Sequence, residues 1–284
     1  MEGPLQLLER LEVGIERSRQ VNSCNVASVT IMVLDWLLTM DMEVSLMWRG
    51  RWNVTKVLYF LTRYMPFIDT SVVMYRQFGT VLSPSLCRIT YEYAAWTFII
   101  GMGCAELILS LRTYAVWNKD KRLLIGLPLL FISTWTVGFI VLGFYLSRTT
   151  HGVSPVPQLL GCIMVDESSI LSACYIVLMI FDACVLALMA IRGISALRSG
   201  GDSQFMRVVY SDGIIYYVYL SALSIFNTVI ILRLPGDYVN LLVMMERVIH
   251  SVLACRVVLH IRELGEVQQR IRLEAFCQGS QIYN

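Results

Sequence analysis

The sequence predicts an all-α membrane protein, a bundle of seven transmembrane helices. Seven apolar runs recur along the 284 residues, each about the 20 residues that a helix needs to cross a hydrocarbon core of roughly 30 Å. Hydrophobic residues make up 56% of the chain and charged residues only 15%, which excludes an ordinary soluble domain. Arginine and lysine also gather in alternate connections between the runs, as in polytopic membrane proteins.

The predicted spans divide the chain into three parts. Residues 1–25 form an N-terminal tail or interfacial helix, 26–259 the seven-helix domain, and 260–284 a cytoplasmic amphipathic tail. No cleavable signal peptide is expected, because the first residues mix acids with arginines and lack an unbroken apolar core. The seven runs cover residues 26–48, 55–75, 88–111, 123–146, 169–191, 211–232 and 239–259.

The distribution of basic residues predicts the orientation. With the N-terminus outside and the C-terminus in the cytoplasm, fourteen arginines and lysines fall in cytoplasmic segments and seven on the opposite side. Positive charge is retained on the cytoplasmic side, so this two-to-one excess favours that orientation. The inner connections are short and basic, and we expect them to contact anionic lipid headgroups or a cytosolic signalling partner.

Two of the eight cysteines are candidates for a disulfide. In this orientation Cys87 begins the third span and Cys162 lies in the connection from 147 to 168, both on the oxidising side. A bridge between them would tie that long connection over the mouth of the bundle. Two unpaired thiols are the alternative.

Polar residues at membrane depth form the candidate functional site, because a charge there needs a partner or a water-filled cavity. Axial rise places Arg63 of the second span near the depth of Asp35 and Asp41 in the first. We therefore expect an ion pair between these two helices, with a polar switch or ion site as the alternative. The full set is Asp35, Asp41, Glu43, Arg63, Glu106, Asp182, Asn227, Glu246 and Arg247.

Acids outnumber cations among the clearest mid-span charges. Two interpretations stay open: some acids are protonated or hydrated by trapped waters, or the cavity holds a cation or a positively charged ligand. The mid-span acids are Asp35, Glu106, Asp182 and Glu246, against Arg63 and Arg247.

Two further features lie at the cytoplasmic side. Arg112 closes the third span, followed by Tyr114, and Asp212 opens the sixth, so an Arg112–Asp212 switch is one interpretation and lipid-phosphate contact by Arg112 the other. The tail places apolar residues on one helical face, which predicts a helix on the membrane surface, and Cys277 is a candidate for acylation.

Motifs for catalysis are absent from the sequence. It contains no His-Glu-x-x-His, Gly-x-Ser-x-Gly, phosphate-binding glycine loop or Cys-x-x-Cys. The three histidines are scattered, so no metal site, cofactor or enzyme activity is expected, and nothing indicates nucleic-acid binding.

The motifs resemble a family of fungal seven-helix membrane proteins that carry a domain of unknown function of the DUF6533 type. The resemblance is carried by residues 37–48 and 56–64, then by Leu-Arg-Thr-Tyr-Ala-Val-Trp at 111–117, Gly-Cys at 161–162, Asp-Gly-Ile-Ile-Tyr at 212–216 and Cys-Arg at 255–256. It implies a seven-helix fold and no particular ligand or activity.

Two function classes follow. A receptor-like sensor of unknown small-molecule ligand, in the plasma membrane or an endomembrane, predicts an outer pocket under the Cys162 connection and no solute flux. The alternative is a small-solute or ion transporter or channel. Residues 31–35 resemble 178–182, as a three-plus-one-plus-three helix repeat would, which predicts a midplane site around Asp35 and Asp182.

Overall fold

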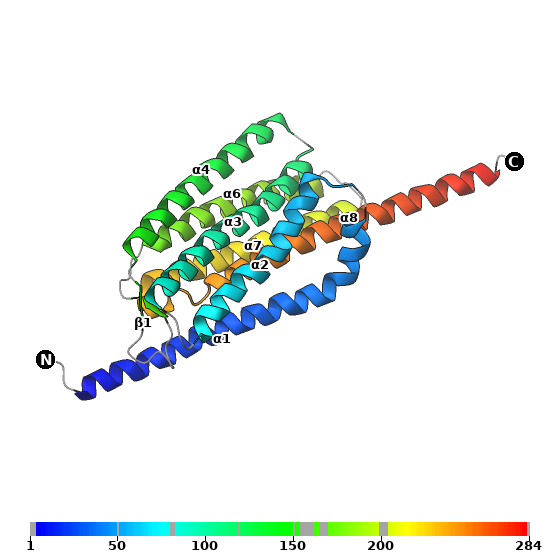
Figure 1. Cartoon of the computed structure of the whole chain (residues 1–284). Coiled ribbons are helices and arrows are strands. Elements are labelled where there is room, and N and C mark those ends of the chain that lie inside the picture. Colours follow the sequence, from blue (N-terminus) through cyan, green and yellow to red (C-terminus); the bar gives the residue numbers. More distant parts are fainter. Residues whose placement is uncertain are drawn as a thin grey trace.

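The protein is a bundle of long α-helices that run roughly side by side (Figure 1). The computed structural model describes residues 4–49, 51–79, 83–118, 120–149, 151–153, 162–164, 170–198 and 204–282. In order, this part of the chain contains α1 (Pro4–Glu43), a π-helical turn η1 (Val44–Trp48), α2 (Val54–Phe78), α3 (Pro84–Val116), α4 (Lys121–Arg148), β1 (His151–Val153), β2 (Cys162–Met164), α6 (Ile170–Arg198), α7 (Gln204–Arg233), a 3-10 turn η2 (Gly236–Tyr238) and α8 (Val243–Ile282).

Local sequence determines where α2 and α3 begin. The Asn53 side chain accepts a hydrogen bond from the backbone N–H of Lys56 at 2.8 Å, and the Ser83 hydroxyl accepts one from Leu86 at 3.2 Å. Pro84 occupies the first turn of α3, where its missing N–H costs nothing. These caps satisfy donors that a first helical turn leaves free.

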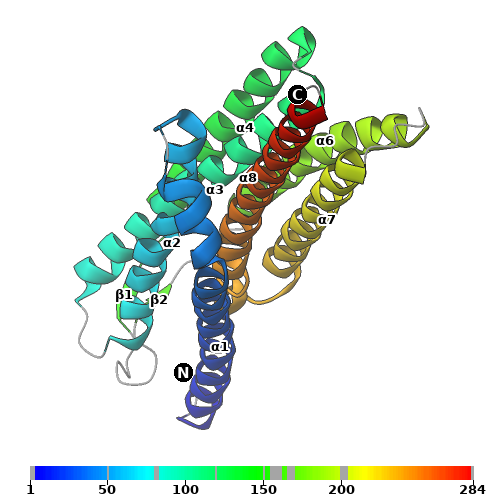
Figure 2. The same ribbon diagram turned by 90° about the vertical axis from the view of Figure 1, so that its right-hand side faces the viewer.

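The last helix, α8, lies at the centre of the bundle (Figure 2). It contacts α1, α2, α3 and α7, while α6 packs between α4 and α7, and α2 packs along α3. The largest hydrophobic cluster takes buried residues from α2, α3, α4, α6, α7 and α8, so these six helices share one core. By contrast, α1 contacts mainly α8.

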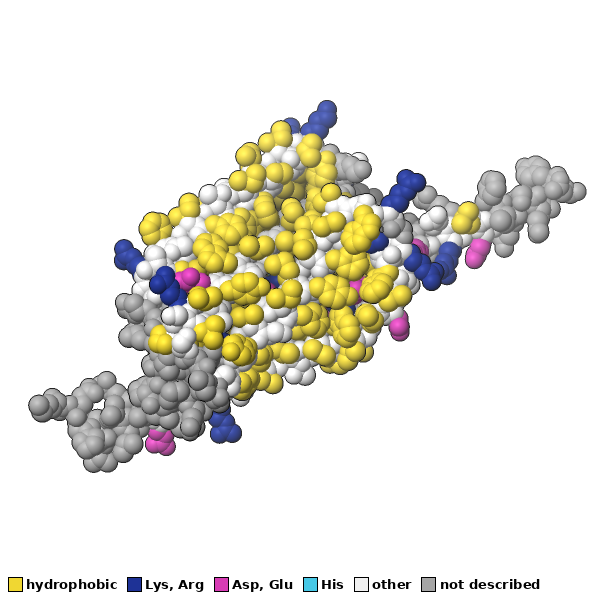
Figure 3. All heavy atoms as spheres, viewed as in Figure 1, with side chains coloured by type: hydrophobic (Ala, Val, Ile, Leu, Met, Phe, Trp, Pro, Cys, Tyr) yellow, Lys and Arg dark blue, Asp and Glu magenta, His cyan; other side chains and the backbone are white. Residues whose placement is uncertain are grey.

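The surface between the ends of the bundle is apolar. Hydrophobic side chains cover most of the face in Figure 3, and lysines and arginines gather toward its ends. On α4 alone, the large exposed side chains include Leu124, Ile125, Leu129, Ile132, Ile140 and Phe144. A continuous apolar belt of this kind is suited to lipid rather than to water.

Five of the seven α-helices in the described residues are long and apolar enough to cross a membrane, and the chain is a polytopic membrane protein. The sequence predicted seven spans. The other two helices, α2 and α8, are less apolar. They carry charged residues that are buried inside the bundle, including Arg63, Asp69, Glu246 and Arg247. The five qualifying segments are Glu12–Trp48, Pro84–Val116, Lys121–Arg148, Ile170–Ser195 and Ile214–Arg233.

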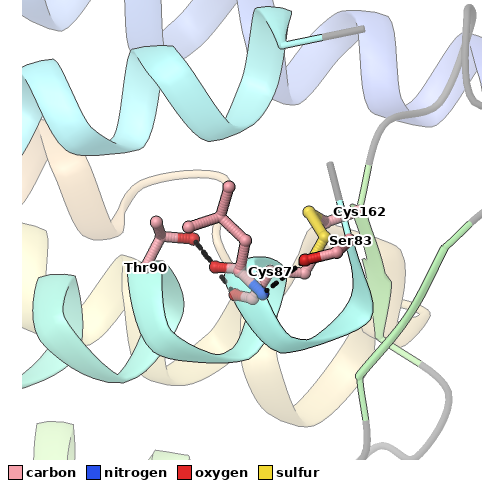
Figure 4. The surroundings of a disulfide bond; sticks show 5 residues. Ser83, Cys87, Thr90 and Cys162 are labelled. Carbon is pink, nitrogen blue, oxygen red and sulfur yellow. Dashed lines mark hydrogen bonds between the residues drawn. A yellow bond between two sulfur atoms is a disulfide. The ribbon is translucent and has the colours of Figure 1, made fainter. Parts of the chain in front are cut away.

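A disulfide closes one end of the bundle (Figure 4). Strands β1 and β2 pair antiparallel with Val153 opposite Cys162, and Cys162 is bonded to Cys87 in the first turn of α3, with 5.8 Å between the Cα atoms. The predicted pairing is therefore present. We call this the disulfide end and the opposite end, where α1 finishes and α8 leaves the bundle, the tail end.

Both terminal segments extend helices of the bundle. The predicted boundaries at residues 25 and 260 fall within unbroken helices, since α1 starts at Pro4 and α8 continues to Ile282 (Figure 1). No proline interrupts α8, and its two glycines, Gly265 and Gly279, weaken the helix without ending it. Whether the tail lies on a membrane surface stays a prediction.

A π-helical turn ends α1 at the tail end. It is followed by Arg49 in an extended conformation, and the backbone carbonyl of Leu46 within the turn accepts a hydrogen bond from Nη1 of Arg262 at 3.0 Å. The indole N–H of Trp48 donates to Oε1 of the buried Glu43 at 3.1 Å. The extra residue of a π turn frees a carbonyl from the regular ladder, and here α8 supplies its partner.

Candidate functional site

Arg63 joins α2 to α1 through two ion pairs inside the bundle. Its Nη1 lies 2.8 Å from Oδ2 of Asp35 and its Nε 3.1 Å from Oε2 of Glu43, and all three side chains are almost fully buried. Nη2 donates to the Trp36 carbonyl at 3.2 Å and also to Thr39 Oγ1. The guanidinium is thus satisfied on every nitrogen, as a buried cation requires.

The second acid of this cluster differs from the expected one. Asp41 is exposed and takes no part, whereas Glu43, two residues later, is fully buried. Glu43 also accepts from the hydroxyl of Tyr64 at 2.6 Å. Asp35 receives a further bond from Nε of Arg256 at 2.5 Å, which brings α8 into the cluster.

A second buried ion pair links α2 to α8. Nε of Arg247 lies 3.1 Å from Oδ2 of Asp69, and both side chains are buried. The Arg247 guanidinium lies against the backbone of Gly101 on α3, where an added Cβ would be 2.0 Å from Nη2. Only glycine leaves room for the cation at that position. Asp69 was not among the predicted residues, because depth counting alone did not reveal its partner.

The remaining mid-span acids meet in one cluster at the centre of the bundle. The Ser224 hydroxyl lies 2.8 Å from Oε1 of Glu246 and 3.2 Å from Oδ2 of Asp182, so α6, α7 and α8 converge there. Asn227 donates to the other oxygen of Glu246. Nδ1 of His250 lies 2.9 Å from Oε1 of Glu106 on α3.

This acid cluster is fully buried and incompletely hydrogen-bonded among the described residues. Glu106, Asp182, Glu246 and His250 are all 0% exposed. The Glu106 and His250 atoms are close enough for a hydrogen bond, but the bond angle is unfavourable. Both carboxylate oxygens of Glu106 and Oδ1 of Asp182 therefore receive no hydrogen bond from the described residues. In the same described ranges, no set of three or more His, Cys, Asp or Glu side chains is arranged to hold a metal ion.

A cavity lies between the acid cluster and the disulfide. Its volume is about 130 Å³. An apolar protein cavity of roughly 150 Å³ can hold a molecule the size of benzene, so this space suits a small ligand. It is smaller than the sites of about 300–1,000 Å³ that hold drug-sized ligands. We call it the disulfide-end pocket.

The pocket is apolar at its deeper end, which we call its floor, and carries polar groups at the end nearer the disulfide, which we call its mouth. Met102, Trp135 and Leu178 pack together at the deeper end. Nearer the disulfide, the hydroxyls of Tyr91 and Tyr145 lie 2.8 Å apart, and the guanidinium carbon of Arg76 is 4.7 Å from the centre of the Tyr91 ring. Helices α1, α2, α3, α4, α6 and α8 all contribute side chains to the pocket.

The other predicted site residues fall partly outside the described side chains. Arg112 is 7% exposed near the tail end of α3 and Tyr114 is half-buried against the main core. The side chains of Asp212 and Cys277 are outside the described set, so the Arg112–Asp212 switch and acylation of Cys277 stay predictions.

The comparison with known families concerns the N-terminal part of this assembly, where α1 supplies Asp35 and Glu43 and α2 supplies Arg63. Residues 23–68 match DUF6533, a family of unknown function. The DUF6533 segment therefore contains the whole contact of Arg63 with Asp35 and Glu43. The motifs at 111–117, 161–162, 212–216 and 255–256 lie beyond the match. No curated protein and no solved structure matches the chain.

Proposed function

We propose that the protein is a receptor-like sensor that spans the membrane seven times and binds a small, mainly apolar molecule in the disulfide-end pocket. The observation that carries this proposal is the position of the pocket. At the disulfide end its lining includes Tyr91, one helical turn from Cys87, and at its floor Met102 follows Gly101, which lies against the guanidinium of Arg247.

Helix α8 supports a route from the pocket to the opposite end. Val243 and Met244 line the pocket, Glu246 and His250 belong to the acid cluster one turn deeper, and Arg256 reaches Asp35. A ligand that shifts one end of this helix changes contacts along its whole length. Such a shift is how a bound molecule selects one of two arrangements of a packed bundle.

The charge pattern supports seven crossings with the disulfide end outside. Charges in α2 and α8 are paired within the bundle, which lowers the cost of placing these two helices in lipid. The excess of basic residues belongs to the connections at the tail end. An oxidising exterior also suits the Cys87–Cys162 bond.

A transporter with one midplane site around Asp35 and Asp182 has less support. Asp35 bonds to Arg63 and Arg256, whereas Asp182 belongs to the separate cluster around Ser224. Neither carboxylate lines the pocket.

The proposal is tested by binding of radiolabelled decan-1-ol to the full chain in phosphatidylcholine nanodiscs, corrected for empty discs. Saturable binding near one molecule per chain is expected. Leu178→Trp fills the pocket and removes the binding, whereas Ile180→Trp, two residues away and 53% exposed, preserves it. Decan-1-ol binding no greater than that of empty discs would contradict a ligand site in the pocket.

A second measurement separates sensor from transporter. Hydrogen–deuterium exchange of the α8 peptides from residues 260–282 is expected to change with decan-1-ol in the parent protein and not in Leu178→Trp. Potassium efflux from proteoliposomes stays at the protein-free rate. Potassium efflux that depends on the protein and is lost in Asp182→Asn would contradict the sensor proposal and support the transporter.

A further inference from the structure

We propose that the ligand of the disulfide-end pocket is an amphipathic carboxylic acid, with its carboxylate on Arg76 at the mouth and its aliphatic chain toward Trp135 and Leu178. This inference rests on the proposed function and adds the chemical class of the ligand. It follows from the placement of a single charge at one end of an otherwise apolar cavity.

Arg76 is the only charged residue among those that line the pocket. It is half-buried near the end of α2, and no carboxylate of the described residues lies within ion-pair distance of it. The nearest surface pair in sequence, Arg88 with Glu92 on α3, is self-contained at 2.6 Å. A partly buried guanidinium beside an apolar cavity is more stable with an anionic partner.

Among the described residues, none accepts a hydrogen bond from Arg76, so its N–H groups are available to a ligand. Its guanidinium carbon lies 4.7 Å from the centroid of the Tyr91 ring, within cation–π range, and this contact uses no N–H hydrogen bond. The N–H groups in the plane can then donate two parallel bonds, the arrangement that a carboxylate accepts. Asn25 and Asn240 also line the cavity and add neutral polar groups.

The length and lining of the pocket define the rest of the ligand. Tyr91 near the mouth and Met102 at the floor are eleven residues apart on α3, which is roughly 16 Å along the helix. Between them the wall is formed by side chains such as Phe98 and Leu142. A narrow apolar cavity of this length suits one aliphatic chain, which gains free energy in proportion to the apolar area that it buries.

The test compares decanoate with decan-1-ol in the nanodisc binding assay, at a pH where the acid is ionised. Decanoate is expected to bind about tenfold more tightly, because a hydrogen-bonded charge pair is stronger than a neutral hydrogen bond. Arg76→Gln is expected to remove that preference, and elution of the variant at the parent volume in size-exclusion chromatography shows that it is folded. Arg88→Gln, an exposed arginine on α3, keeps the preference.

Several results overturn the inference. Equal affinity for the two probes, or a preference that survives Arg76→Gln, excludes Arg76 as the carboxylate site. Decanoate binding that appears only after Asp166→Asn with Glu167→Gln would mean that an acid of this chain occupies Arg76. Competition by phosphatidylglycerol in the disc would identify a membrane lipid as the occupant.

The two proposals fail in different ways. If decan-1-ol binds saturably and loses binding in Leu178→Trp while decanoate shows no preference, the sensor pocket stands and the carboxylate class falls. If neither probe binds saturably, both fall.

Discussion

Gly101→Ala is expected to destabilise the protein by displacing a buried arginine. The new Cβ would lie 2.0 Å from Nη2, 2.4 Å from Cζ and 2.9 Å from Nε of Arg247. Ordinary contacts begin near 3.4 Å, so the guanidinium must withdraw by the difference, about 1.4 Å. Its Nε is already 3.1 Å from Asp69, and a retreat of that size breaks the bond.

The magnitude follows from two opposing effects. Separating a buried ion pair by disturbing one partner costs about 3 kcal/mol or more. Alanine is the better helix former, which offsets about 1 kcal/mol. The net loss is therefore about 2 kcal/mol, or roughly 4–8 °C in the midpoint of thermal unfolding.

Gly103→Ala is the matched control on the same helix. Its Cβ would make only ordinary contact, 3.6 Å from the Trp135 ring, so this variant should melt at or slightly above the parent temperature. The assay is size-exclusion chromatography of detergent-solubilised protein after stepwise heating. If Gly101→Ala and Gly103→Ala unfold at the same temperature, Arg247 is not held against α3 and the reasoning is refuted.

Three further predictions concern the other contacts. Arg63→Gln should lower stability by about 3–5 kcal/mol in the same assay. Asp35→Asn should then lower the stability of the Arg63→Gln variant much less than it lowers that of the parent protein, and equal losses in the two proteins would argue against the ion pair. Cys87→Ser should remove the mobility difference between reduced and non-reduced gels and lower stability by about 2–4 kcal/mol, so an unchanged gel pattern counts against the bridge. Arg112→Asp combined with Asp212→Arg should restore surface expression lost in each single variant, and failure to do so would remove this pair from consideration.

The sequence predicted the depth of each charged residue along its helix, but not the direction in which its side chain points around the helix axis. Counting residues from the ends of the apolar runs placed Arg63 level with Asp35, and the two are bonded. The same count could not separate Asp41 from Glu43. Two residues turn a helix by about 200°, so these acids lie on opposite faces, and only packing against α2 decides which one is buried.

Partners from distant helices were the other gap. Asp69 meets Arg247 and His250 meets Glu106 because α8 is inserted among α2, α3 and α7, an arrangement that hydropathy does not specify. The pocket was expected under the Cys162 connection, but its lining depends on side chains from six helices, α1, α2, α3, α4, α6 and α8. The predicted orientation placed both Cys87 and Cys162 on the oxidising side, so the sequence offered the bridge as one of two open interpretations, and the structure contains it.

The unbroken course of α8 gives the molecule a lever. The helix continues for 36 residues from Glu246, in the acid cluster, to Ile282, a distance of about 54 Å. Because Leu259 is the last α8 residue of the main core, a tilt of about 5° at that point would move the far tip, roughly 35 Å away, by about 3 Å. A small change of angle where α8 leaves the core therefore produces, at the far tip, a displacement of about half a helical turn.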